Sequence, residues 1–241
     1  MTTNVSSSQE TGFRWLPFVT AGFVTALIVS NLIAVKLALI GPFLLPAAVI
    51  VFPISYIFGD VLTEVYGYSK ARQVIWTGFI WNLFAVIAIS LGGLLTPAPI
   101  WNAGSLTSPE ASQQAYDAIF GFAPRVLGAS FVAYLFGEFL NSFVLAKMKI
   151  MTAGKHLWAR TIGSTLIGEL ADSAIFLTLA FAGLMPVPVL GQLIVVQWLF
   201  KSAYEAAVTP LTYIVVNALK RAEGIDVYDT HTNFSPIPGT E

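Results

Sequence analysis

Residues 52–67 read Phe-Pro-Ile-Ser-Tyr-Ile-Phe-Gly-Asp-Val-Leu-Thr-Glu-Val-Tyr-Gly. This run is apolar enough for a membrane, yet it carries two carboxylates, Asp60 and Glu64, four residues apart. In a helix that spacing places both on one face, in line with Phe52 and Tyr56. An ionisable side chain within a membrane-spanning helix costs about 2.5 to 3.5 kcal/mol. The stretch therefore predicts a helix whose acidic face lines a polar interior.

The composition is that of a membrane protein. Of the 241 residues, 56% are hydrophobic and 10% are charged, whereas soluble domains carry about 25% charged residues. We therefore expect an all-α, polytopic protein surrounded by the lipid bilayer. The net charge of -1 argues against nucleic-acid binding. The lack of cysteine, with only two histidines, argues against a metal site, and no cofactor is indicated.

Six segments have the length of spanning helices, which need about twenty mostly apolar residues. They cover residues 17–35, 45–65, 74–95, 126–146, 162–184 and 190–218. We expect one transmembrane domain over residues 1–241, with short tails at 1–15 and 220–241. Residues 96–123 are expected to form a loop.

Prolines mark the second of these segments. Pro42, Pro46 and Pro53 lie near its start, where a proline would interrupt a helix. They predict a broken or re-entrant entry into the second span.

Lysine and arginine predict the orientation. With six spans, nine of these residues fall on one side of the membrane and two, Lys36 and Arg125, fall on the other, while Lys201 lies within the sixth span. The nine are Arg14, Lys70, Arg72, Lys147, Lys149, Lys155, Arg160, Lys220 and Arg221. Because positive charge is enriched in cytoplasmic loops, both termini are expected in the cytoplasm.

Two further patterns concern how the helices are arranged. Gly59-Asp60…Glu64 has an echo in Gly168-Glu169…Asp172, which suggests a 3+3 inverted repeat of the kind found in many secondary transporters. The first span carries small residues at every fourth position from Gly22 to Ala38, which allows close helix approach. This stripe fits packing within the chain, or a partner-docking face such as that of a homodimer.

Several polar residues fall inside the other apolar segments at helical spacing. Glu138 and Asn141 are three residues apart, and so are Glu169 and Asp172, so each pair lies on one helical face. Gln197, Lys201 and Glu205 follow at intervals of four, and Asn31 lies in the first span. These residues predict a shared polar cavity. Lys201 and Glu205 could also neutralise one another, and Glu64 could lie at the membrane boundary.

A cavity lined by carboxylates, amides and aromatic rings favours a planar ligand with N–H donors, or a cation. A carboxylate can accept two parallel hydrogen bonds from a guanine-like edge that carries a ring N–H and an exocyclic amine. The carboxylates could equally carry protons. From the residues alone, the prediction is a small polar solute or a proton pathway.

Motifs of common enzymes are missing from the sequence. It contains no phosphate-binding loop ending in Gly-Lys-Ser/Thr, no Gly-x-Ser-x-Gly elbow and no His-Glu-x-x-His motif. Asp60 and Asp172 lack the motif context of an intramembrane aspartyl protease. We therefore expect a protein that is not an enzyme and has no catalytic residues.

The sequence Asp60-Val-Leu-Thr-Glu-Val-Tyr-Gly67, followed by Lys70-Ala-Arg72, resembles the signature of the queuosine precursor transporter family, also called the vitamin uptake transporter family. The resemblance continues through Pro124-Arg125, Gly168…Asp172, Lys201 and the segment 223–236, and so covers most of the chain. In the family, positions 138 and 169 are often amides, whereas both are glutamates here. Whether these two contact a ligand or carry protons therefore stays open.

The resemblance implies a six-helix importer of queuosine precursors in the bacterial inner membrane. Its substrates would be 7-cyano-7-deazaguanine and 7-aminomethyl-7-deazaguanine, which cells salvage for queuosine in tRNA. Together with the residue pattern, it predicts the substrate-binding residues Asn31, Phe52, Tyr56, Asp60, Glu64, Glu138, Asn141, Glu169, Asp172 and Lys201. Arg72 and Arg125 would be gates or topology anchors.

Two other classes of membrane protein stay open. One is the substrate-binding subunit of an energy-coupling vitamin importer, which borrows an ATPase, or a transporter of another purine-like or vitamin solute. Ala34 and Ala38 have the spacing with which such subunits dock their partner. The other is a structural scaffold that binds no ligand.

Overall fold

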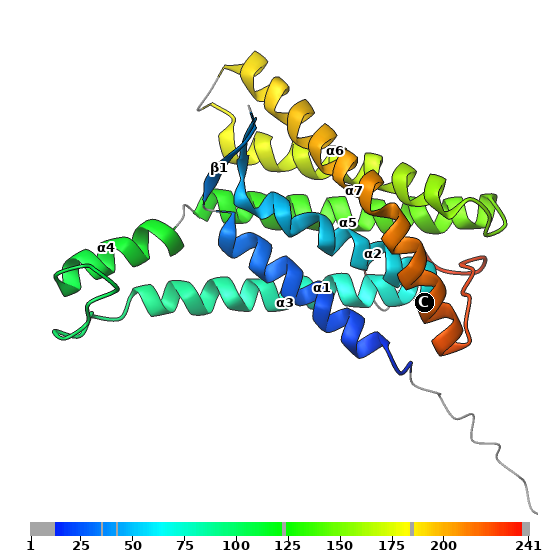
Figure 1. The fold of residues 1–241 in the computed structure, drawn as a ribbon, viewed down its shortest axis with the longest axis horizontal. Coiled ribbons are helices and arrows are strands. Elements are labelled where there is room, and N and C mark those ends of the chain that lie inside the picture. Colours follow the sequence, from blue (N-terminus) through cyan, green and yellow to red (C-terminus); the bar gives the residue numbers. More distant parts are fainter. Residues whose placement is uncertain (1–12, 35, 42, 122–123, 184–185, 238–241) are drawn as a thin grey trace, which may run out of the picture.

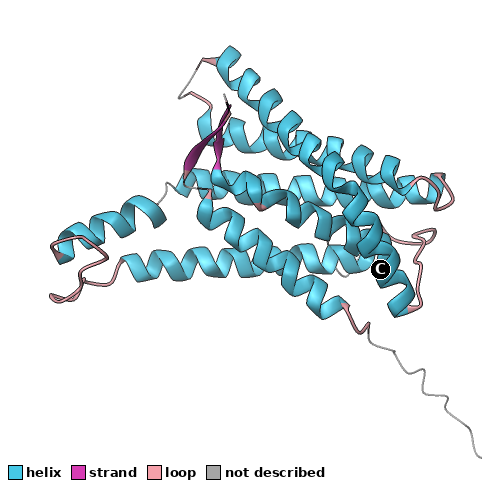
Figure 2. Cartoon of the chain, in the orientation of Figure 1, coloured by secondary structure: helices cyan, strands magenta, loops and turns pink. Residues whose placement is uncertain are grey.

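The computed structural model describes residues 13–237, apart from residues 35, 42, 122–123 and 184–185. The chain forms a bundle of long helices with one small hairpin at one end (Figures 1 and 2). Its elements, in order, are α1 (Leu16–Ile33), β1 (Leu37–Ile40), β2 (Phe43–Pro46), the short 3-10 helix η1 (Ala47–Ile50), α2 (Phe52–Tyr66), α3 (Tyr68–Gly93), α4 (Pro109–Phe120), α5 (Pro124–Met151), α6 (Leu157–Phe181) and α7 (Val187–Glu223).

Four described helices are long and apolar enough to cross a membrane. They are α1, α3, residues 128–151 of α5, and α6. Helix α2 has 15 residues, and α7 has 37 residues that include Lys201 and Glu205. Each of the six predicted segments overlaps one of these helices, although the bounds differ.

The second predicted segment starts differently from the sequence-based expectation. A helix was expected from residue 45, but residues 37–46 form an antiparallel hairpin in which Leu37 pairs with Pro46 and Ile40 with Phe43. Helix α2 begins only at Phe52, with Pro53 in its first turn, where the missing N–H costs no hydrogen bond. The broken entry predicted from the prolines is confirmed, although Pro42 lies outside the described residues.

The predicted loop 96–123 contains a helix, α4, which is a correction to the sequence-based expectation. Ser108 caps this helix by accepting a hydrogen bond from the backbone N–H of Ala111 at 3.1 Å, and Pro109 opens its first turn. Glu110 follows, and hydrogen bonds from its own backbone N–H and from Ser108 lower its pKa. Ser-Pro-Glu is a helix-start pattern, so the sequence held a local signal for α4.

One end of the bundle gathers several chain segments, and we call it the tail end. The carboxylate of Glu223, the last residue of α7, accepts hydrogen bonds from the backbone N–H groups of Arg14 and Trp15, just before α1, at 3.0 and 2.6 Å. The connections α2–α3 and α5–α6 lie at the same end (Figure 1). The hairpin and the connections α3–α4 and α6–α7 lie toward the opposite end, the hairpin end.

The residues after α7 pack back onto the tail end. Gly224 ends α7 with a φ of 69°, which favours glycine, and residues 225–237 then run along α3. Arg72 donates hydrogen bonds to the carbonyls of Asn233 and Ser235, at 3.2 and 2.9 Å. Trp76 donates to the carbonyl of Pro236 at 2.7 Å. The tail therefore belongs to the packed structure.

The small-residue stripe of α1 faces inward. A Cβ added at Gly22 would lie 2.6 Å from the ring of Phe58 in α2, and Ala26 and Ser30 are buried. These contacts support the packing of α1 within the chain. Around them lies an apolar core shared by α1, α2 and α3, with Phe23 and Leu62 fully buried.

Candidate functional site

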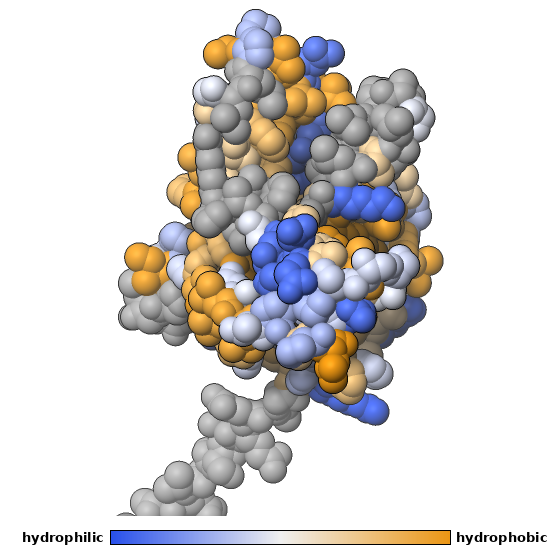
Figure 3. Space-filling view, turned by 90° about the vertical axis from the view of Figure 1, so that its left-hand side faces the viewer, coloured by the Kyte–Doolittle hydropathy of each residue, from blue (hydrophilic) through white to orange (hydrophobic). Residues whose placement is uncertain are grey.

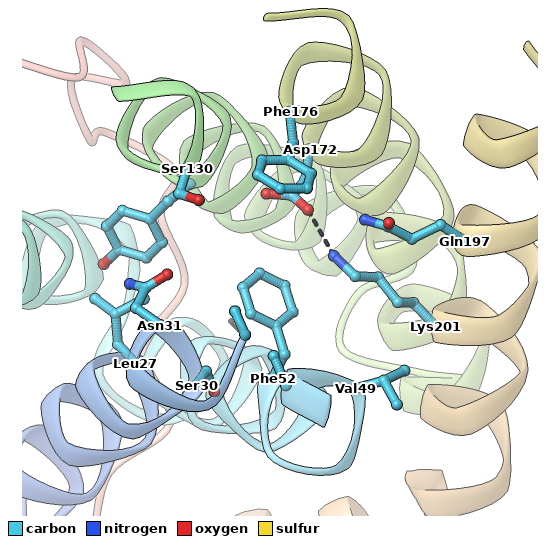
Figure 4. A pocket seen from close by; sticks show the side chains of 13 residues that line it. Leu27, Ser30, Asn31, Val49, Phe52, Ser130, Asp172, Phe176, Gln197 and Lys201 are labelled. Carbon is cyan, nitrogen blue, oxygen red and sulfur yellow. Dashed lines mark hydrogen bonds and ion pairs between the residues drawn. The ribbon is translucent and has the colours of Figure 1, made fainter. Parts of the chain in front are cut away.

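A cavity lies between the helices in the half of the bundle nearer the hairpin (Figure 4). It contains about 610 Å³ of space not filled by protein atoms, including its opening. Its lining comes from α1, η1, α2, α5, α6 and α7: Leu27, Ser30, Asn31, Ala34, Ala48, Val49, Phe52, Ser130, Tyr134, Asp172, Phe176, Gln197 and Lys201. Seen from the hairpin end, polar residues gather toward the middle of the molecule, with apolar residues beside them (Figure 3).

An ion pair crosses this cavity. Lys201 of α7 donates a hydrogen bond to Asp172 of α6 at 2.6 Å, and its Nζ also lies 3.0 Å from Glu169 (Figure 4). The same Nζ lies 3.8 Å from the centre of the Phe52 ring, close enough for a cation–π interaction. Because Lys201 and Asp172 are 6% and 4% exposed, water screens the pair little. The Lys201–Asp172 ion pair is therefore a charged group within a mostly apolar pocket.

One or two helical turns toward the tail end lie the other predicted acidic residues. Asp60, Glu138 and Glu169 are at most 1% exposed, and so is Glu205 of α7. Asn141 of α5 donates a hydrogen bond to Asp60 at 2.8 Å. Tyr56, between Phe52 and Asp60 on α2, is also fully buried. None of these residues lines the cavity.

Glu64 lies one helical turn further toward the tail end than Asp60, within a cluster of cations. Its Oε1 is 2.8 Å from Arg160, 2.7 Å from Lys220 and 3.5 Å from Lys149. Asp226 of the tail joins the cluster through Lys149 at 2.7 Å and Lys220 at 2.8 Å. Partial burial raises the pKa of Asp226, but the hydrogen bonds from the two lysines outweigh it, and the pKa falls below its usual value.

The structure thus separates the predicted site residues. It brings Asn31, Phe52, Asp172 and Lys201 to the cavity, and it places Arg72 against the tail. The side chain of Arg125 lies outside the described part of the chain. Glu64 takes part in the tail-end cluster and does not line the cavity.

Other cavity residues were not among the predicted site residues: Ser30, Ser130, Tyr134, Phe176 and Gln197. One signal could have found Gln197, because it precedes Lys201 by four residues and so shares its helical face. Ser30 carried no such signal, since small residues in a membrane helix more often mark close packing.

Comparisons with known proteins agree with this architecture. The family described as "Putative vitamin uptake transporter" matches residues 46–215. A Bacillus subtilis (strain 168) protein named "Probable queuosine precursor transporter" is 30% identical over 197 residues, which are 81% of each chain. A Haemophilus influenzae protein of the same name is 26% identical over 130 residues, 54% of this chain and 49% of its own. No solved structure matches the chain significantly.

The family match covers the hairpin's last residue, every element from η1 to α6 and most of α7, whereas α1 lies before it. The relatives are transporters by name, and the described helices include several that can cross a membrane. The protein is therefore a multi-pass membrane protein. The chain belongs to the vitamin uptake transporter family, together with the relatives named as queuosine precursor transporters.

Proposed function

We propose that this chain imports queuosine precursors, 7-cyano-7-deazaguanine and 7-aminomethyl-7-deazaguanine, across the bacterial inner membrane for queuosine salvage. The observation that carries the proposal is the Asp172–Lys201 pair in the cavity, where a buried carboxylate stands among aromatic side chains. Pockets for small ligands combine mostly apolar walls with a few placed polar groups. The names of the relatives supply the substrate class.

The cavity offers the groups that a deazaguanine base needs. The Asp172 carboxylate can accept two parallel hydrogen bonds from the ring N–H and the exocyclic amine of a guanine-like edge. Phe52 and Phe176 line the same cavity and supply flat faces for the ring plane (Figure 4). Asn31 adds an amide that can donate and accept.

Six crossings with both termini in the cytoplasm fit this import. The start of α1 and the end of α7 lie at the tail end, as an even number of crossings requires. The predicted cytoplasmic cations Arg72, Lys149 and Arg160 lie there as well. At 1.5 Å per residue, α2 spans only about 22 Å of an apolar layer about 30 Å thick. Non-helical backbone is tolerated at membrane depth where it lines a cavity, and η1 does so.

The test is uptake of radiolabelled 7-cyano-7-deazaguanine into cells that neither make nor import it. Asp172→Asn should lower uptake by about tenfold to a hundredfold, because a hydrogen bond to a charged group contributes about 1.5 to 3 kcal/mol. Asp117→Asn, at an exposed position on α4, is the matched control and should transport normally. Unchanged uptake and affinity in Asp172→Asn would remove Asp172 from the binding site.

A purified-protein experiment separates this proposal from the ATPase-dependent alternative. Transport of the labelled base by the chain alone in liposomes would exclude a need for a second subunit. Binding of the base without transport would favour the substrate-binding subunit of an energy-coupling importer. No binding of the base would contradict the proposed substrate.

A further inference from the structure

Three acidic residues lie one or two helical turns from the cavity, toward the tail end, and have no role in the proposed binding of the base. Together they form what we call the acidic layer. Asp60 on α2, Glu138 on α5 and Glu205 on α7 are at most 1% exposed. Within the described part of the chain, both carboxyl oxygens of Glu138 and of Glu205 lack a hydrogen-bond partner, and so does Oδ2 of Asp60. A buried polar atom without a hydrogen-bond partner costs free energy. A proton or an ion bound at these carboxyl groups would therefore stabilise them.

The charges around them are strongly unbalanced. The titratable and charged groups that face this layer are Tyr56, Asp60 and Glu64 on α2, Tyr134 and Glu138 on α5, Glu169 and Asp172 on α6, and Lys201 and Glu205 on α7. Lys201 is already paired with Glu169 and Asp172. Glu64 is paired with three other cations, Lys149, Arg160 and Lys220. No described cation is therefore paired with Asp60, Glu138 or Glu205. Their negative charges would repel one another with little screening, so the fully ionised layer is unfavourable.

The packing favours a proton as the occupant over a metal ion. In the described chain, no three acidic or histidine side chains are placed to hold a metal ion. Space is also short, since a Cβ added at Gly59 would lie 2.7 Å from Oε2 of Glu138. The missing side chain at Gly59 makes room for the carboxyl group and little more. A proton needs no coordination sphere and no cavity of its own.

We propose that Asp60, Glu138 and Glu205 form a proton-binding site that couples import of the base to proton entry. This inference rests on the proposed function. Glu205 follows Lys201 by one turn of α7, so an ionised Glu205 would compete with Asp172 for the lysine. Protonation of the layer leaves Lys201 with Asp172, which keeps Asp172 ionised and in place to accept hydrogen bonds from the base, and binding of the base to this pair in turn favours the protonated layer. The two occupancies are therefore linked, and the linkage is reciprocal.

A route toward the cytoplasm continues from this layer. Glu64 follows Asp60 by one turn of α2, and its Oε2 has no hydrogen-bond partner among the described residues. Beyond it lie Lys149, Lys220 and Asp226, the last of which is partly exposed at the tail end. Carboxyl groups spaced in this way form proton relays in many transporters.

The first experiment measures accumulation of labelled 7-cyano-7-deazaguanine by the purified chain in liposomes, with the membrane potential clamped at zero. The exterior is set one pH unit more acidic than the interior. One proton per base then supports about tenfold accumulation, and equal pH supports none. The double variant Glu138→Gln/Glu205→Gln should lose the accumulation but keep exchange of labelled for unlabelled base, which also shows that it folds. Glu110→Gln, on the exposed first turn of α4, is the matched control and should accumulate normally.

Three outcomes would overturn the proposal. They are a wild-type accumulation ratio of one under the pH gradient, a double variant that still accumulates tenfold, and accumulation driven by a sodium gradient at equal pH. If the base neither binds nor crosses, the proposed function fails, and a second measurement still tests the proton site. Infrared difference spectra of the purified protein without substrate should show a buried carboxylic-acid band that titrates with pH and weakens in Glu138→Gln. No such band would overturn the proton site itself.

Discussion

Lys201 is the single residue on which the cavity depends most. Its Nζ is shared by Asp172 at 2.6 Å, Glu169 at 3.0 Å and the face of Phe52 at 3.8 Å. One cation thus offsets two buried carboxylates and holds an aromatic wall in place. A buried charge is tolerated only when it is paired, so these groups are interdependent.

Replacing this lysine should be costly in a way that a second change repairs. Lys201→Met should lower the free energy of unfolding by about 3 to 5 kcal/mol, because it leaves buried carboxylates without their cation. Adding Asp172→Asn should recover part of the loss. Thermal unfolding of the purified protein in detergent measures both variants, with exposed Lys155→Met as the control. Equal stability of Lys201→Met and the native protein would show that the pair contributes nothing.

The cavity residues could be predicted from sequence only where a polar side chain stood in an apolar run. Asp172 and Lys201 were found in this way, and both line the cavity. Asp60 and Glu64 share a face of α2 as predicted, but each helical turn carries a residue to a different depth, about 5.4 Å further along. Spacing along a helix shows which face a residue occupies. The level at which neighbouring helices open a cavity depends on how they pack, so the separate surroundings of Glu64 could not be foreseen.

Among the described helices, α5 and α6 share the most extensive contact. A Cβ added at Gly168 of α6 would lie 2.8 Å from Cβ of Asn141 and 3.0 Å from the carbonyl oxygen of Gly137, both in α5. Small residues at such a crossing let two membrane helices approach closely. This contact holds Asp172 against Gly137 of α5 and so fixes the position of a residue that lines the cavity.

A methyl group at this crossing should force the two helices apart. Gly168→Ala should destabilise the protein by about 1 to 3 kcal/mol, as overpacking does in a tight interior. Gly191→Ala is the matched control, since nothing lies within 4 Å of its added Cβ, and it should gain up to about 1 kcal/mol of helix propensity. Thermal unfolding of both variants gives the comparison. A Gly168→Ala protein as stable as Gly191→Ala would mean that the helices adjust freely.

Long apolar helices were the most predictable elements, because twenty apolar residues have few alternatives in a membrane protein. The hairpin before α2 was not predicted, although Pro46 and Pro53 indicated a break. The two strands pair their backbone N–H and C=O groups with each other. This short apolar run therefore needs no helix to satisfy its backbone hydrogen bonds. Helix α4 was missed because its composition is polar and its start signal, Ser108 to Glu110, is only local.

Taken across the bundle, the two ends differ in how they are held. The cavity lies in the half of the bundle nearer the hairpin end, whereas the tail end is tied by ion pairs around Glu64 and by residues 225–237. The ring of Phe234 lies 3.9 Å from Lys147 Nζ and packs against Tyr68. In this conformation the tail end is therefore held, among the described residues, by more polar and ionic contacts than the hairpin end.

Loosening the tail should be detectable without unfolding the helices. Asp229 is 3% exposed, and its carboxylate accepts hydrogen bonds from the backbone N–H of Tyr68 at 3.0 Å and from Thr232 at 2.7 Å. Asp229→Ala should cost the tail about 1 to 3 kcal/mol and so raise hydrogen exchange in residues 225–237. His231→Ala, at an exposed position, should leave exchange unchanged. Native exchange in Asp229→Ala would mean that Arg72 and Lys149 suffice to hold the tail.

The order of the chain gives this tail a place in the protein's synthesis. Residues 226–236 leave the ribosome after every helix that they join, yet they supply the oxygen atoms that Lys149, Arg72 and Trp76 bind. A nascent chain with all its helices already in the bilayer would still lack these contacts at the tail end. The tail can therefore pack against the tail end only after every helix has been made, and a chain cut short after α7 would lack these contacts.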